Sequence, residues 1–86
     1  MPATWAIQVG SFSTEKAARR AASAGRRVAD GGEVSVESAM VKRRTTWRAQ
    51  VIGLTSSDAQ AACAALAKRK SPCIVIKPDA KQVASR

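Results

Sequence analysis

The sequence contains no histidine, which removes the most common general base and the most common metal ligand of proteins. Its six acidic residues are scattered along the chain, and no glycine-rich phosphate loop follows an expected strand. Ser11 has no evident base that would activate its hydroxyl as a nucleophile. We therefore predict that this chain is not an enzyme and that it holds no metal and no cofactor.

Aromatic residues are also rare, because Trp5, Phe12 and Trp47 are the only ones among 86 residues. Hydrophobic residues reach 45% of the sequence, but many of them are alanines, which bury little area each. A chain of this length buries only roughly 60% of the surface that its unfolded form exposes. The core of this one small domain must therefore depend on close backbone approach and on any covalent tie.

Long apolar runs are missing as well. No stretch approaches the roughly 20 apolar residues of a membrane-spanning helix, and the first residues lack the basic and apolar segments of an export signal. We expect residues 1–4 to be a linker, residues 5–78 to form the domain and residues 79–86 to be a polar tail. No membrane insertion is expected of this segment, which we interpret as one module of a longer protein.

Positive charge, in contrast, is abundant. Fifteen lysines and arginines against six acidic residues give a formal net charge of +9. Such a balance favours an anionic partner, and nucleic acid, anionic lipid and acidic glycan all fit that description. The alternative is that the charge only keeps a small domain in solution.

Two periodicities predict the fold. Alternation predicts strands over residues 5–12, 33–43, 47–54 and 73–76, with a polar turn over residues 42–46. Alanine-rich spacing of three and four residues predicts helices over residues 13–29 and 55–70, with Ser13 and Thr55 as their N-caps. The expected packing stripe of the first helix consists of Ala18, Ala21, Ala22, Gly25 and Val28. Gly10 is expected to give a tight exit from the first strand. The order βαββαβ predicts an α+β, ferredoxin-like or RNP-like domain in which both helices cover one face of a four-stranded antiparallel sheet.

The other sheet face is then bare and becomes the candidate binding surface. In the first strand Gln8 points to this face, opposite to Ile7 and Val9. Two registers are open for the third strand. Alternation favours the one in which Arg48 and Gln50 share the bare face with Gln8 while Trp47 and Ala49 are buried. In the other, Trp47 lies on the bare face as a stacking platform.

Cys63 and Cys73 are the only thiols. They are too few and too isolated for a zinc site, so the alternatives are two buried small side chains or a disulfide. We favour a disulfide that joins the second helix to the last strand. It would indicate an oxidising compartment such as the bacterial periplasm.

The first strand also resembles a known family. Its residues Trp5-Ala6-Ile7-Gln8-Val9-Gly10-Ser11-Phe12 follow the pattern that opens SPOR (sporulation-related repeat) domains: aromatic, any, aliphatic, Gln, aliphatic, Gly, Ser or Ala, aromatic. Residues 47–54, 61–66 and 73–76 resemble the second half of these domains. The cysteine pair is similar to pairs in envelope proteins of some Gram-negative bacteria.

This resemblance implies a function. SPOR domains bind septal peptidoglycan, namely glycan strands that lack stem peptides, and they target larger periplasmic proteins such as D-alanyl-D-alanine carboxypeptidases or division proteins. We expect the same of a monomer of this chain. The resemblance and the sheet pattern together give the following ligand-binding candidates: Gln8, Ser11, Trp47, Arg48, Gln50 and Ile74. One departure is visible in the third strand, because counting back from Gly53 places Ala49 where many members have arginine. Matching Trp47 and Arg48 to the aromatic-arginine pair of the family instead leaves one extra residue before the glycine, which a bulge near residues 51–52 would absorb.

Two other functions remain open at this point. The same topology and positive charge describe the RNA-recognition motif, although that module stacks bases on aromatic residues that the first strand does not offer on its bare face. A protein-docking module that uses an exposed sheet edge is the third possibility.

Overall fold

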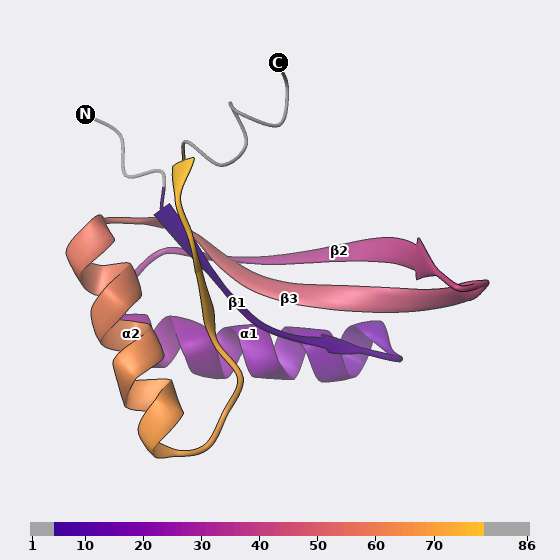
Figure 1. Ribbon diagram of the computed structural model, residues 1–86, viewed down its shortest axis with the longest axis horizontal. Helices are drawn as coiled ribbons and strands as arrows, with labels where there is room; N and C mark the ends of the chain where they lie inside the picture. The colour runs from indigo at the N-terminus through magenta and orange to yellow at the C-terminus, as the bar shows by residue number, and fades with distance from the viewer. Residues whose placement is uncertain (1–4, 79–86) are drawn as a thin grey trace.

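The computed structural model describes residues 5–78, which form one antiparallel sheet and two helices (Figure 1). The elements are β1 (Trp5–Phe12), α1 (Glu15–Ala29), β2 (Glu33–Val41), β3 (Arg44–Leu54), α2 (Ser56–Lys68) and β4 (Ile74–Ile76). The four strands lie in the order β2-β3-β1-β4. The predicted α+β fold and its βαββαβ order are thereby confirmed. The expected linker over residues 1–4 and the expected tail over residues 79–86 lie outside the described residues.

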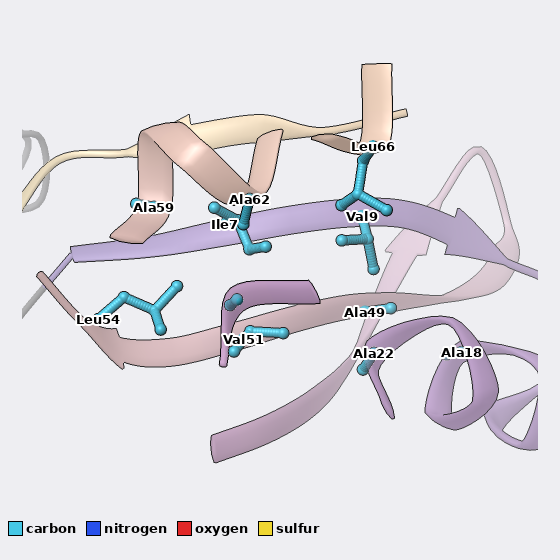
Figure 2. Close-up of a cluster of buried hydrophobic side chains, with 11 residues drawn as sticks. Ile7, Val9, Ala18, Ala22, Ala49, Val51, Leu54, Ala59, Ala62 and Leu66 are labelled. Atoms are coloured by element: carbon cyan, nitrogen blue, oxygen red, sulfur yellow. The ribbon is translucent and has the colours of Figure 1, made fainter. Parts of the chain in front are cut away.

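Both helices pack on the same side of the sheet and against each other. Figure 2 shows the core that results, in which small residues of the helices meet branched residues of the strands. The buried helix residues are Ala18, Ala22, Gly25 and Ala29 of α1 and Ala59, Ala62 and Leu66 of α2. Ile7, Val51 and Leu54 are the largest fully buried side chains. Because the helix residues are so small, the helices can lie close to the strands.

Helix α1 lies especially close to the sheet at Gly25. A Cβ atom at Gly25 of α1 would lie 3.0 Å from Cγ1 of Val9 and 3.4 Å from Cγ2 of Val51. Any larger side chain there would press α1 away from β1 and β3. The sequence placed Gly25 in the packing stripe of the helix, and this contact gives the reason for a glycine at that position.

The helix caps follow the expected chemistry at one helix and differ at the other. The Thr55 hydroxyl accepts a hydrogen bond from the Asp58 amide at 3.0 Å, as predicted for α2. In α1 the cap is Thr14, whose hydroxyl accepts from the Ala17 amide at 3.2 Å, so the assignment of Ser13 was wrong by one residue. Two adjacent hydroxyl residues satisfy the same sequence pattern, and only the start of the helix distinguishes them.

Gly10 does not end the first strand, contrary to expectation. The strand continues to Phe12, and its pairing with β3 is irregular between Gln8 and Gly10, which leaves Val9 as an extra residue. Gly10 has φ of +139°, which favours glycine, and its backbone lies within the bulge. The glycine thus keeps the strand paired through an irregularity and does not release it.

The hairpin between β2 and β3 is longer than predicted. Its turn contains only Lys42 and Arg43, so β3 begins at Arg44 and not at Trp47. Pairing of β2 with β3 continues to the last pair, Val41 with Arg44, whereas β1 pairs with β3 only as far as Trp47. The end of the hairpin therefore extends beyond the sheet as a two-stranded ribbon (Figure 1).

A disulfide joins Cys63 of α2 to Cys73, which immediately precedes β4. The two Cα atoms lie 5.2 Å apart, and both residues pack against the core as partly buried side chains. The bond fixes the chain just before its shortest strand. Neither helix of the described region is long and apolar enough to cross a membrane.

Candidate functional site

A row of four side chains crosses the sheet on the side opposite to the helices. Register pairs Gln8 with Gln50 of β3 and with Ile74 of β4, and Gln50 in turn with Ser35 of β2. Residues directly opposite on paired strands share one face of the sheet. The row Ser35, Gln50, Gln8 and Ile74 therefore takes one residue from each strand.

The two glutamines of this row are already joined. Gln50 Nε2 donates a hydrogen bond to Gln8 Oε1 at 3.2 Å, and both side chains are half-buried. Within residues 5–78 this leaves Gln8 Nε2 free to donate and Gln50 Oε1 free to accept. The pair thus presents one donor and one acceptor whose positions are fixed by a mutual contact.

A second row lies beside the first. Arg48 of β3 is paired with Ser11 of β1 and with Glu37 of β2, and all three side chains are exposed. In the described residues the one ion pair within 4.0 Å joins Arg19 to Glu15, so Glu37 does not hold the Arg48 guanidinium at that distance. Arg48 is accordingly available to an anionic group of a ligand.

The register of β3 places Trp47 on the helix side. It lies opposite Phe12, two residues before the buried Ala49, and packs against the core as a partly buried side chain. The pairing is irregular between Val51 and Leu54, close to the bulge expected at residues 51–52. Of the two registers considered from the sequence, the structure has the one that turns Arg48 and Gln50 to the open face.

Apolar side chains of β3 and β4 lie beside these rows on the same face. Ile74 is 61% exposed and Ile52 is 39% exposed, and Ile76 lies two residues beyond Ile74 on the same side of β4. The sequence-based candidates included Ile74 but missed Ser35, Ile52 and Ile76. Alternation places Ile76 with Ile74 and Ser35 with the wet residues of β2, so the signal for these two was present.

Five of the six candidates lie together on the open face: Gln8, Ser11, Arg48, Gln50 and Ile74. Trp47 is the exception. The assembled face can bind a ligand through polar, ionic and apolar contacts, since it combines amides, a hydroxyl, a guanidinium and apolar branched chains. Within the described part of the chain no group of three histidine, cysteine or acidic side chains is placed to hold a metal ion.

A family model decides the relationship of this chain to known proteins. The model of the SPOR domain matches residues 2–77. The chain belongs to the SPOR family. SPOR domains are peptidoglycan-binding modules of bacterial envelope proteins at the division site, and they are not catalytic. No match was found among curated proteins or among solved structures.

Proposed function

We propose that this SPOR domain binds glycan strands of septal peptidoglycan that lack stem peptides, and that it does so with the open sheet face. The bound domain would hold a larger periplasmic protein, such as a carboxypeptidase or a division protein, at the septum. The observation that carries this proposal is the joined pair Gln8 and Gln50 at the centre of a four-strand row.

The chemistry of the row suits an amino sugar polymer. Gln8 Nε2 and Gln50 Oε1 offer a donor and an acceptor to hydroxyl and acetamido groups, while Ile74 offers an apolar surface to the face of a pyranose ring. Sugars have both kinds of surface on each residue. A face with amides beside exposed aliphatic side chains is therefore complementary to a glycan along its length.

Arg48 provides a positive charge that can bind the carboxylate of denuded strands. Removal of the stem peptide by an amidase leaves a free lactyl carboxylate on N-acetylmuramic acid, and a guanidinium binds a carboxylate with two parallel hydrogen bonds. Arg48 is exposed on the same face, one row from the glutamine pair. Stem peptides would remove this carboxylate and would crowd a flat surface, which explains the proposed preference for naked strands.

Trp47 has a different role in this proposal. Because it packs against the core opposite Phe12, it supports the strand that carries Arg48 and does not touch the ligand. The disulfide between Cys63 and Cys73 supports a periplasmic location, since such bonds persist in oxidising compartments. Family membership does not favour the RNA-binding alternative.

A pull-down experiment tests the proposal. Purified sacculi, untreated or treated with amidase, are incubated with the domain at physiological salt, and single-stranded RNA serves as the competing ligand. We expect retention on amidase-treated sacculi to exceed retention on untreated sacculi and RNA not to compete. Equal retention on both preparations would refute the preference for denuded strands, and retention on RNA alone would refute glycan binding.

A further inference from the structure

The end of the β2–β3 hairpin carries a combination of side chains that the glycan face does not explain. Residues 39–46 form the ribbon beyond β1, and their sequence is Ala-Met-Val-Lys-Arg-Arg-Thr-Thr. This segment, called here the hairpin tip, has three consecutive cations and no acidic residue. It also carries Met40, 70% exposed, and Val41, 44% exposed.

Met40 and Val41 project to opposite sides of the ribbon, because successive residues of a strand alternate. A flat and rigid partner would contact only one of them. A fluid interface into which the tip is immersed would contact both, while the long side chains of the basic residues extend back to the polar groups. The pattern of apolar residues on both sides of a basic turn therefore fits a lipid surface better than a flat rigid surface.

The backbone of the turn does not favour the residues that occupy it. Lys42 has φ of +49° and Arg43 has φ of +68°, which are the values that a two-residue type I′ turn requires. Asparagine and glycine are the usual residues at these positions, and lysine and arginine are costly there. The local backbone thus gives no reason for two cations at the tip, which favours a reason in what the tip contacts.

We propose that the hairpin tip docks on a phospholipid bilayer with anionic headgroups, as an interfacial contact that does not span the membrane. Lys42, Arg43 and Arg44 bind headgroup phosphates, and Met40 and Val41 enter the boundary of the acyl chains. Nucleic acid would satisfy the cations but would leave both apolar side chains in water. Envelope proteins at a division site lie next to such a membrane, so the tip would orient the glycan face relative to the bilayer.

Vesicle binding tests this inference independently of glycan binding. The chain is sedimented with vesicles of phosphatidylcholine and with vesicles that contain about 30% phosphatidylglycerol, a fraction that gives a negative surface potential. The variant Lys42→Asn/Arg43→Gly removes two charges and installs the residues that the turn prefers, so it retains its stability. The control variant Lys68→Gln/Lys70→Gly removes two charges at the end of α2, where Lys70 also has positive φ, +59°.

We expect the chain to bind the anionic vesicles and the turn variant to bind them more than about tenfold more weakly, since each interfacial cation contributes roughly a factor of five. The control variant should bind within about twofold of the unchanged chain. Met40→Thr/Val41→Thr should also weaken binding, because threonine keeps the strand but removes the apolar contact. All variants should be retained on sacculi as before.

Three results would overturn the inference. The first is no preference of the unchanged chain for anionic vesicles, and the second is an equal loss for the turn variant and the control variant, which would indicate unspecific charge attraction. The third is a loss of sacculus binding by the turn variant as large as its loss of vesicle binding. That result would assign the hairpin tip to the glycan site.

Discussion

Gln50 Nε2 donates to Gln8 Oε1 across 3.2 Å, which joins two side chains 42 positions apart in the sequence on adjacent strands. Each glutamine thereby restricts the rotamers of the other before any ligand arrives. A site whose polar groups are already ordered loses less conformational entropy on binding. The contact therefore gives the open face its one preorganised donor and acceptor pair among the described residues.

Gln8→Ala should weaken binding to amidase-treated sacculi by about 3- to 10-fold, the value of one direct hydrogen bond and its preorganising contact. The free energy of unfolding should fall by no more than about 1 kcal/mol, because water can replace the lost partner of a half-buried Gln50. Sedimentation with sacculi and urea unfolding measure the two quantities.

Gln60→Ala is the matched control for this variant. It removes a glutamine side chain that also donates a hydrogen bond, from Nε2 to Ser56 Oγ at 3.0 Å, but on the exposed surface of α2. Its sacculus binding should equal that of the unchanged chain. A large loss of stability in Gln8→Ala, with binding and stability falling together, would show that Gln8 serves the fold and not the ligand.

Arg48 and its cross-strand neighbour Glu37 should have opposite effects on binding. Arg48→Gln removes the cation proposed to meet the lactyl carboxylate, whereas Glu37→Gln removes a negative charge directly opposite it. Because both side chains are exposed, each change should shift the affinity for denuded strands by about 2- to 5-fold, downward for the first and upward for the second.

Ionic strength provides the control for this pair. Both shifts should shrink between low and high salt, since exposed charges are screened over roughly 10 Å at 0.1 M. The carboxylate contact is refuted if both variants weaken binding alike, or if their shifts persist unchanged in concentrated salt.

Gly32 and Gly31 form a matched pair for the packing at the start of β2. Both have positive φ, but a Cβ at Gly32 would lie 2.7 Å from the Ile52 carbonyl oxygen, while a Cβ at Gly31 would meet nothing within 4 Å. Gly31→Ala should lower the free energy of unfolding by about 1 to 2 kcal/mol through backbone strain alone. Gly32→Ala should lower it by about 2 to 4 kcal/mol, because steric overlap adds to the strain. Urea unfolding of the two variants side by side measures the difference, and equal losses would contradict the steric contribution.

The sequence predicted those parts of the fold that depend on local periodicity. Alternation in β1 separated Gln8 from Ile7, and helix spacing identified Ala18, Ala22 and Gly25 as packing residues, which the structure confirms. These predictions hold because the residues alternate or recur with the period of the element itself. The cap of α1 was misplaced by one residue because Ser13 and Thr14 are chemically equivalent in a sequence pattern.

The composition of the open face depended on information that the sequence does not contain locally. Ile74 lies beside Gln8 only because β4 pairs with β1, and the neighbour of Gln50 on β2 follows from a register between separate strands. The short turn at Lys42 was missed for another reason. Lysine and arginine are poor residues for positive φ, so the usual signal of a two-residue turn was absent. Pairing between strands overrode the local preference.

The disulfide should contribute about 2 to 3 kcal/mol to stability, because it closes a loop of ten residues in the unfolded chain. Reduction of the unchanged chain is the sharper test than substitution, since both sulfur atoms stay in the core and no cavity forms. The urea midpoint should fall on reduction, and Cys63→Ser/Cys73→Ser should unfold at a similar or lower midpoint. An unmoved midpoint would show that the bond adds nothing to the folded state.

Reduction of the disulfide should also weaken glycan binding, because it loosens β4. This strand has only three residues, it pairs with β1 alone through residues 6–8, and Cys73 is the residue directly before Ile74. Without the bond, Cys63 in the middle of α2 no longer fixes the start of the strand, so Ile74 should lose its position beside Gln8 in part of the molecules. We therefore expect reduced protein, at a temperature where it remains folded, to bind denuded strands several-fold more weakly. Reduction should also accelerate amide hydrogen exchange more in β4 than in β3. Unchanged binding together with faster exchange in β4 would mean that Ile74 lies beside the site without contributing to it.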